Sequence, residues 1–447
     1  MSLIPAFIRR RISHQPGLVK IVDNIGWLFF DKILRMSVGL FVGIWIARYL
    51  GPEQFGLLSF ATAFAGLFGA LASLGLNGVV VRDIVRDPSN ANLTLGTAAL
   101  LQLMGGLISF LMMLAVISFV RADDPLARGI VAILGAMMLL KASEVAAYWF
   151  ESQVLSKYTV WVQSSAFLAF SLVKVYLILQ QAPLLTFAWA MLVEAIVVAI
   201  VLLVVLSRTG PALSSLRASL ERSRTLLADS WPLAISALAI TVYMKIDQIM
   251  LGQMIGDDAV GIYSAAVQIS VLWYFVPVAI ANSVLPTVLE SRRRDIKQYD
   301  ARLKKLYELM VVLSLAVAIP FTFLASPVII LLFGGAYAGA GAVLAIHIWA
   351  SVFVSLGVAS NHWFLAENRP MLNLQRTVLG AAINIILNLW FIPLYGMVGA
   401  AIATVFSQAT AAWLYDALQP ATRAMFLMKM AAMNPFSMLK KQSQRGD

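Results

Sequence analysis

Nine charged side chains fall at least five residues inside the long apolar stretches of the 447-residue chain. The cations are Lys32, Arg35, Lys141, Lys174 and Lys245, and the acids are Asp31, Glu144, Glu194 and Asp247. A charge at the centre of a bilayer costs about 2.5 to 3.5 kcal/mol on insertion scales, so such residues usually serve a function. Cations at this depth can bind an anion such as a phosphate, and carboxylates can exchange a proton or hold a small cation.

Arg35 falls near the middle of the first apolar stretch. Residues at spacings of three and four share its helical face, namely Lys32, Gly39 and Gly43. We expect this face to line a cationic cavity, with Asp31 neutralising Lys32. Two alternatives stay open. A later start of the span would let Arg35 extend toward the headgroups, and the glycines also suit plain helix packing.

The next charges each have more than one interpretation. Lys141 and Glu144 are three residues apart and can form an internal pair or line a cavity. Lys174 lies within two turns of the outer end of its span, so we expect it to extend toward the interface. Glu194 has no local neighbour of opposite charge, and is either a proton-coupling group or half of a cross-helix pair.

Lys245 and Asp247 are two residues apart and therefore point to different faces of a helix. We expect one to line the cavity and the other to pair with a neighbouring helix. Asn384 and Asn388 can bind sugar hydroxyls, although hydrogen bonds between helices explain them as well. The predicted substrate residues are Lys32, Arg35, Lys141, Lys245, Asn384 and Asn388, and the predicted ion-coupling residues are Asp31, Glu194 and Asp247.

Composition places these residues in a bilayer. Hydrophobic residues make up 61% of the chain and charged residues 12%, whereas soluble proteins carry about 25% charged residues. The predicted fold class is therefore all-α, a polytopic membrane protein. Apolar windows predict about twelve spans, at 24–47, 55–76, 95–120, 129–150, 158–180, 183–206, 230–252, 259–288, 306–332, 343–364, 377–393 and 395–416. The first twenty residues lack a signal-peptide core, so we expect the first span to direct insertion.

The positions of the basic residues predict the orientation. If the N-terminus is cytoplasmic, only three of the 33 Lys and Arg residues lie in outer loops, while residues 291–305 alone carry seven on the inner side. Both termini are then cytoplasmic. Inner loops beside anionic lipid explain the net charge of +11, so we expect no nucleic-acid partner. The histidines have no metal-ligand spacing, so we expect no metal and no cofactor. The energy source stays open between H⁺ coupling, Na⁺ coupling and passive exchange.

The chain divides into two halves of six spans. Residues 207–225 are basic and lie in the longest inner loop, and we expect them to form an amphipathic helix on the membrane surface. The predicted parts are an N-terminal bundle at 1–206, a basic linker at 207–229, a C-terminal bundle at 230–416 and a basic tail at 417–447.

The two halves share a motif at predicted outer turns. The segments 42–63 and 247–268 align Gly51 with Gly256, Gly56 with Gly261, Ser59 with Ser264 and Ala61 with Ala266. Because six is an even number, the two copies have parallel orientation. The duplication is typical of carriers built from two similar bundles that rock about a central site, and it predicts a cationic passage at their seam.

Three stretches resemble bacterial polysaccharide-export flippases of the Wzx type, in the superfamily that also holds the MATE drug antiporters. They are "DKILRMSVGLFVGIWIARYLGPEQFGLLSFATAF" (31–64), "LASLGLNGVVVRDIVRD" (71–87) and "FIPLYGMVGAAIATVFSQ" (391–408). The resemblance implies movement of an undecaprenyl-pyrophosphate-linked oligosaccharide from the inner to the outer leaflet of the bacterial cytoplasmic (inner) membrane. Implied partners are membrane lipids, a polysaccharide polymerase and a chain-length regulator, for O-antigen, exopolysaccharide or capsule.

Two other functions are weighed against this one. A MATE-like antiporter for cationic drugs would need an acidic cavity, whereas the deepest charges include Arg35, Lys141 and Lys245. An integral membrane glycosyltransferase or polymerase usually presents carboxylates or arginines in a large outer loop. The longest outer loop predicted here has only about ten residues, which argues against that enzyme class.

Overall fold

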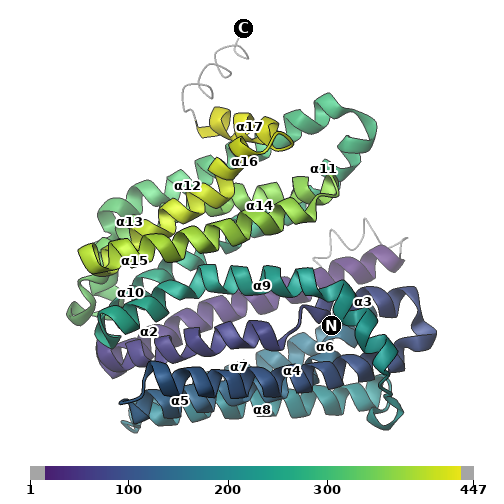
Figure 1. Ribbon diagram of the computed structural model, residues 1–447, viewed down its shortest axis with the longest axis horizontal. Coiled ribbons are helices and arrows are strands. Elements are labelled where there is room, and N and C mark those ends of the chain that lie inside the picture. The colour runs from purple at the N-terminus through teal and green to yellow at the C-terminus, as the bar shows by residue number, and fades with distance from the viewer. Residues whose placement is uncertain (1–15, 434–447) are drawn as a thin grey trace. The chain divides into compact units, whose positions relative to one another are not determined.

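The computed structural model describes residues 16–433, and all regular structure in that range is helical (Figure 1). The helices of the first half are α2 (Pro16–Ala72), α3 (Leu76–Arg86), η1 (Pro88–Asn90), α4 (Ala91–Val120), α5 (Pro125–Gly135), η2 (Ala136–Glu144), α6 (Val145–Ser152), α7 (Lys157–Leu179) and α8 (Leu184–Thr209). Those that follow are η3 (Leu213–Ser215), α9 (Leu220–Met254), α10 (Asp257–Leu272), α11 (Phe275–Arg294), α12 (Ile296–Phe333), η4 (Gly335–Tyr337), α13 (Ala340–His347), α14 (Ala350–Ala366), α15 (Pro370–Ala409), η5 (Thr410–Leu414), α16 (Tyr415–Leu418) and α17 (Arg423–Met433).

Ten helices among the described residues are long and apolar enough to cross a membrane. The predicted all-α, multi-span fold is therefore confirmed. Two of the ten carry an internal bend, at Gly51 in α2 and at Gly396 in α15, where φ is 72° and 60°. Gly51 falls between the first two predicted spans, and Gly396 lies two residues after the predicted break at 394, so the bends account for the difference between ten long helices and twelve spans. Predictions for 1–15 and 434–447, including the end of the basic tail, fall outside the described residues.

The chain forms two units. The first contains the chain up to Leu50 together with Phe60–Thr241, and the second contains Gly51–Ser59 and the chain from Val242 onward. The chain therefore passes from one unit to the other inside α2, returns after nine residues, and passes again inside α9. Each unit has its own packed interior.

The connection before α9 differs from the prediction. The expected amphipathic surface helix over residues 207–225 is wrong, because α8 continues to Thr209 and α9 begins at Leu220. The strap between them lies against α4, where the Arg217 N–H donates to the Asn92 carbonyl at 3.3 Å. A Cβ added at Gly96 would lie 2.3 Å from the Arg217 carbonyl oxygen. The close backbone contact at Gly96 therefore holds residues 210–219 against α4. The spacing of apolar residues along the sequence does not reveal a contact of this kind.

The duplicated motif forms a backbone contact inside the second unit. Gly51 and Gly256 both combine a positive φ with an extended ψ, at φ/ψ of 72°/171° and 130°/174°, and residues other than glycine rarely adopt such a backbone conformation. A Cβ at Gly56 would lie 1.7 Å from the Asp257 carbonyl oxygen, and one at Gly261 would lie 1.9 Å from the corresponding oxygen of Pro52. The two copies therefore pack reciprocally, and each depends on a glycine of the other.

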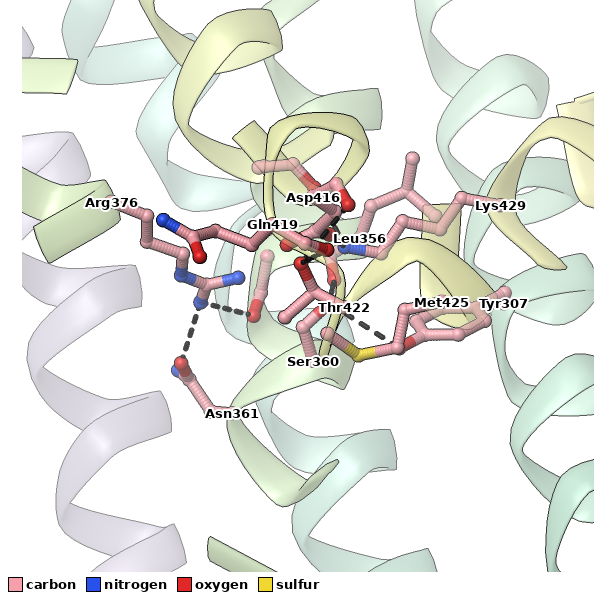
Figure 2. A network of polar contacts seen from close by, with 12 residues as sticks. Tyr307, Leu356, Ser360, Asn361, Arg376, Asp416, Gln419, Thr422, Met425 and Lys429 are labelled. Atoms are coloured by element: carbon pink, nitrogen blue, oxygen red, sulfur yellow. Dashed lines mark hydrogen bonds and ion pairs between the residues drawn. The ribbon is translucent and has the colours of Figure 1, made fainter. Parts of the chain in front are cut away.

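A buried ion pair fixes α17 to the second unit (Figure 2). Lys429 is fully buried and donates to the Asp416 carboxylate at 2.5 Å and to the Ala412 carbonyl at 2.7 Å. Ala412 lies in the π-helical turn η5, whose irregular hydrogen bonding frees carbonyl groups. In Figure 2 the buried Arg376 donates to Asn361 within the same network.

We expect Gly56→Ala and Gly261→Ala each to lower the stability by about 1 to 3 kcal/mol, the usual cost of overpacking. Gly129→Ala is the matched control, because a Cβ there meets nothing within 4 Å. Tryptophan fluorescence of the detergent-solubilised protein during thermal unfolding measures the difference. An unchanged Tm for both variants would contradict the backbone contact.

Lys429→Met should destabilise the protein by about 3 to 5 kcal/mol, because it leaves the Asp416 carboxylate buried without its cation. The double variant Lys429→Met/Asp416→Asn should recover much of that loss. Arg423→Met, at an exposed position of the same helix, is the control and should change little. Equal Tm values for Lys429→Met and Arg423→Met would show that the buried pair is not a determinant of stability.

Candidate functional site

Asp247 is the centre of a buried polar cluster in the second unit. It lies on α9 with 4% of its surface exposed. One carboxylate oxygen accepts from the Tyr263 hydroxyl at 2.6 Å and from the Thr404 hydroxyl at 2.5 Å. The other oxygen accepts from the Asn388 amide at 2.6 Å. Helices α9, α10 and α15 therefore converge on one carboxylate.

Two amides of α15 complete this cluster. Asn388 and Asn384 are fully buried, one helical turn apart, and the Asn388 amide nitrogen lies 3.3 Å from the Asn384 oxygen. Asn384 also donates to Ser407 at 3.2 Å. The side-chain oxygen of Asn388 is buried without a hydrogen-bond partner. Both amides are buried near Asp247 and make hydrogen bonds between helical segments, Asn388 to α9 and Asn384 to the part of α15 beyond Gly396. Of the two alternatives for these asparagines, sugar binding and interhelical hydrogen bonding, these contacts match the second.

The Asp247 cluster has the chemistry of a site for a proton or a small cation. Among the described residues, no Lys or Arg forms an ion pair with Asp247. A carboxylate without a counter-charge at this depth is stable when protonated or when it holds a cation. In the described part of the chain, no group of three or more His, Asp or Glu side chains could bind a metal ion. One carboxylate with amide and hydroxyl oxygens therefore suits a monovalent charge.

Lys245 lies two residues before Asp247 and faces different neighbours. Its side chain is half-buried, and within residues 16–433 it has no hydrogen-bond or ion-pair partner. The nearest charge along the chain, Asp247, is committed to hydroxyl and amide groups. Lys245 is thus a cation at membrane depth with its full hydrogen-bonding capacity available to a ligand.

Arg35 and Asp31 form an ion pair in the first unit. The Arg35 Nε donates to Asp31 at 2.7 Å, and the Ser164 hydroxyl donates to the same carboxylate oxygen at 2.5 Å. The expectation that Asp31 neutralises Lys32 is therefore wrong, because Asp31 pairs with Arg35 and Lys32 is exposed. The Arg35 guanidinium lies 5.2 Å from the Phe167 ring centre, and its Nη2 is buried without an acceptor.

The first unit contains a cavity of about 340 Å³ between α2, η2, α7 and α8. Its polar lining includes Lys141, Glu144 and Gln163, and small residues such as Gly66 and Ala195 widen it. Lys141 donates to Glu144 at 2.6 Å. The two alternatives for this pair therefore hold together, since it is an internal pair that also lines a cavity. Nine consecutive residues of η2 are 3₁₀-helical, an unusually long run of a kind that often marks a hinge.

Glu194 and Lys174 form a cross-helix pair between α8 and α7. Their charged atoms are 2.8 Å apart, and their side chains are 18% and 14% exposed. The expectation that Lys174 extends toward the interface is therefore wrong. A local partner for Glu194 was absent from the sequence because the partner lies 20 residues away on another helix.

The sequence analysis missed Tyr263, Thr404 and Ser164 as parts of these clusters. One signal was available for Tyr263, which replaces Leu58 at the equivalent position of the first repeat copy. A polar residue at a position that is apolar in the other copy indicates a difference between the two halves. For Thr404 and Ser164, no sequence pattern distinguishes these hydroxyls from the many that bond to their own helix.

Comparisons with known proteins agree with one another about the family. A family model described as "Polysaccharide biosynthesis protein" matches residues 21–291, and the model described as "MatE" matches residues 232–390. The probable low-salt glycan biosynthesis flippase Agl15 of Haloferax volcanii is 24% identical over 388 residues, covering 83% of this chain and 77% of that protein. The probable flippase AglR of the same organism is 30% identical over 174 residues, covering 37% and 35%.

Solved structures identify the fold. The inward-facing conformation of a multidrug resistance MATE family transporter of the MOP superfamily has a TM-score of 0.70 at 18% identity, with 92% of this chain and 96% of that chain covered. The lipid II flippase MurJ in its inward closed conformation has a TM-score of 0.69 at 14% identity, with 92% and 91% covered. The predicted MATE-like fold is therefore confirmed.

Proposed function

Because this chain belongs to the polysaccharide biosynthesis protein family, we propose that it is a flippase for undecaprenyl-pyrophosphate-linked oligosaccharides. It moves the sugar-bearing head from the inner to the outer leaflet of a bacterial cytoplasmic membrane by alternating access. Flippase-named relatives of similar length support the transport reaction. The observation that carries the proposal for the cargo is the unpaired Lys245 at membrane depth.

The head group needs a polar route. Moving one sugar hydroxyl into an apolar medium without a partner costs roughly 2 to 7 kcal/mol, so an oligosaccharide cannot cross the hydrocarbon unaided. The cavity of the first unit offers donors and acceptors from Lys141, Glu144 and Gln163 that suit sugar hydroxyls. Its volume of about 340 Å³ is sufficient for part of an oligosaccharide at a time, rather than for a long chain.

Lys245 binds the pyrophosphate in this proposal. A cation without a carboxylate partner retains its full attraction for an anion, whereas the charge of Arg35 is offset by Asp31 at 2.7 Å. In the first unit, Arg35 has a buried Nη2 donor without an acceptor, and Lys32 is an exposed cation on the same helix. This distribution favours an anionic cargo over the cationic drugs of a MATE-like antiporter.

Asp247 couples transport to H⁺ or Na⁺. Its carboxylate is buried, has no cationic partner among the described residues and accepts hydrogen bonds from the Asn388 amide and the Thr404 hydroxyl, with Asn384 one turn away on α15. Binding of a monovalent cation there would change the contacts that hold α9 to α10 and α15. The two asparagines, first considered for sugar hydroxyls, are assigned to this ion site because they are fully buried around Asp247.

Lys245→Ala should reduce surface polysaccharide at least about tenfold in a strain that lacks the chromosomal gene, because a hydrogen bond to a charge contributes about 1.5 to 3 kcal/mol. Lys245→Arg retains the charge and should retain most of the transport. Lys305→Ala, at an exposed position, is the control for a lost positive charge. Full export by Lys245→Ala at normal protein level would remove this residue from the mechanism.

Asp247→Asn should remove the dependence of transport on an imposed H⁺ or Na⁺ gradient, because a neutral amide cannot exchange either ion. Proteoliposomes with each gradient applied separately identify the ion. Asp258→Asn, at an exposed position in the first turn of α10, should behave as the unaltered protein. If Asp247→Asn responds to the gradient as strongly as that control, the coupling site lies elsewhere.

A further inference from the structure

A second hollow of the first unit is a groove of about 690 Å³ between α2, α7 and α8. Its walls are apolar along most of their length. Val197, Val201 and Val205 of α8 form one wall, and Val162, Ala166 and Ala169 of α7 form the other. None of these residues belongs to the polar cavity that we assign to the oligosaccharide.

The groove runs along the helices rather than across them. Its α8 residues recur at every fourth position and its α7 residues at intervals of four and three, so each set forms a stripe parallel to the helix axis. From Lys157 to Ala169 the α7 wall covers twelve residue steps, or about 18 Å at 1.5 Å per residue. A groove of this length and direction matches an extended hydrocarbon chain in one leaflet.

One end of the groove is polar. Lys157 and Tyr158 begin α7, and the Lys157 ammonium lies 5.2 Å from the Tyr158 ring centre. No carboxylate of the described residues forms an ion pair with Lys157. Trp27 and Trp161 lie at the same end, with ring centres 5.8 Å apart. Lysine and tryptophan side chains of this kind mark the level of lipid headgroups.

Trp27 supplies an independent indication of a ligand. Only 8% of its surface is exposed, it lines the groove, and its indole N–H is buried without an acceptor. A buried donor without a partner costs about 1 to 3 kcal/mol, so an acceptor from a bound molecule would be favourable. Lys157 and Trp27 both line this end of the groove, so a phosphate bound there would find a cation and an N–H donor among the lining residues.

Helix α8 is shared by the groove and by the polar cavity. Val197 and Val201 face the groove, whereas Val198 and Leu202, the next residue in each case, line the cavity. A single helix, about 10 Å in diameter, therefore separates an apolar groove from a polar cavity. This arrangement matches a lipid whose head is large enough to occupy the polar cavity while its hydrocarbon tail lies in the groove, as in a lipid-linked oligosaccharide.

We propose that the groove binds the isoprenoid chain of the lipid carrier, with Lys157 and Trp27 contacting its phosphate when the carrier first binds, before the pyrophosphate reaches Lys245. The inference rests on the proposed function and deepens it. The polar cavity accounts only for the sugar head of the substrate, and the groove provides a binding site for its hydrocarbon tail. The tail stays in hydrocarbon throughout, so only the head has to be desolvated during transport.

The test uses the purified full-length protein in phosphatidylcholine nanodiscs with a photoreactive polyprenyl phosphate. Cross-linked peptides are identified by mass spectrometry, and labelling should map to α7 and α8. Val201→Trp fills the groove and should reduce labelling about tenfold, as expected when a bulky side chain occupies a packed site. Val204→Trp, an exposed valine of the same helix outside the groove, should leave labelling unchanged.

Two further variants test the polar end. Lys157→Met and Trp27→Phe should each weaken binding of polyprenyl phosphate about fivefold. Neither should change binding of the uncharged polyprenol. Equal losses for both lipids would instead mean that these variants disturb the groove itself and would overturn the assigned phosphate contact.

Competition distinguishes the carrier from ordinary lipid. Unlabelled polyprenyl phosphate should displace the probe, and phosphatidylglycerol at the same concentration should not. Displacement by both lipids alike, or full labelling of Val201→Trp, would overturn the inference. Failure of the proposed function is a separate result. In that case deletion of the gene leaves surface polysaccharide unchanged, whereas failure of the groove alone leaves export dependent on the gene but insensitive to Val201→Trp.

Discussion

The cost of a charge inside hydrocarbon governs the arrangement of polar side chains in both units. Most of the intramembrane charges are matched at short range, including Arg35 with Asp31, Lys141 with Glu144 and Lys174 with Glu194. These pairs permit long apolar helices to carry charge without a large penalty. Lys32 has no counter-charge among the described residues but is exposed, which leaves two of these intramembrane charges unmatched and buried or half-buried in the described part of the chain. Lys245 has no partner, and Asp247 has only neutral ones.

Both exceptions lie on α9, the helix in which the chain passes from one unit to the other. A ligand at either residue therefore acts on the element that connects the units. We propose this as the physical basis for coupling an ion at Asp247 to an anionic cargo at Lys245, because each ligand would change the contacts of the same helix. Proline at position 232 interrupts the hydrogen bonding of α9 and gives it a site at which to bend.

Much of the fold could be predicted from the sequence, because apolar stretches and breaks are local features. The bends at Gly51 and Gly396 fall where the turns were expected. Contacts between distant residues could not be predicted in this way. Asp247 meets Asn388 and Thr404 across 141 and 157 residues, and the repeat gave no sign that Gly56 and Gly261 pack against each other's backbone. The connection before α9 differs from the prediction because the four arginines of residues 207–225 suggested a surface helix, whereas residues 210–219 lie between α8 and α9.

The sequence indicated which charged and polar residues lie within the membrane-spanning helices, but it did not show which partner each of them contacts. Arg35 was expected to act as a free charge, but its pairing with Asp31 leaves it a hydrogen-bond donor. The asparagines of α15 were considered for sugars, and their complete burial associates them with Asp247. In each case the neighbour that decides the role comes from a second helix or from an earlier turn, and single-sequence reasoning could only state both alternatives.

The most direct test of the central claim is transport by the purified protein in proteoliposomes, measured with two lipid-linked oligosaccharides that differ only in the linkage. One carries the pyrophosphate and the other an uncharged linkage to the same polyprenyl chain and sugars. The account predicts protein-dependent translocation of the first and little of the second. Equal translocation of both lipids would contradict an anion-binding role for Lys245, and translocation of neither would contradict the proposed function itself.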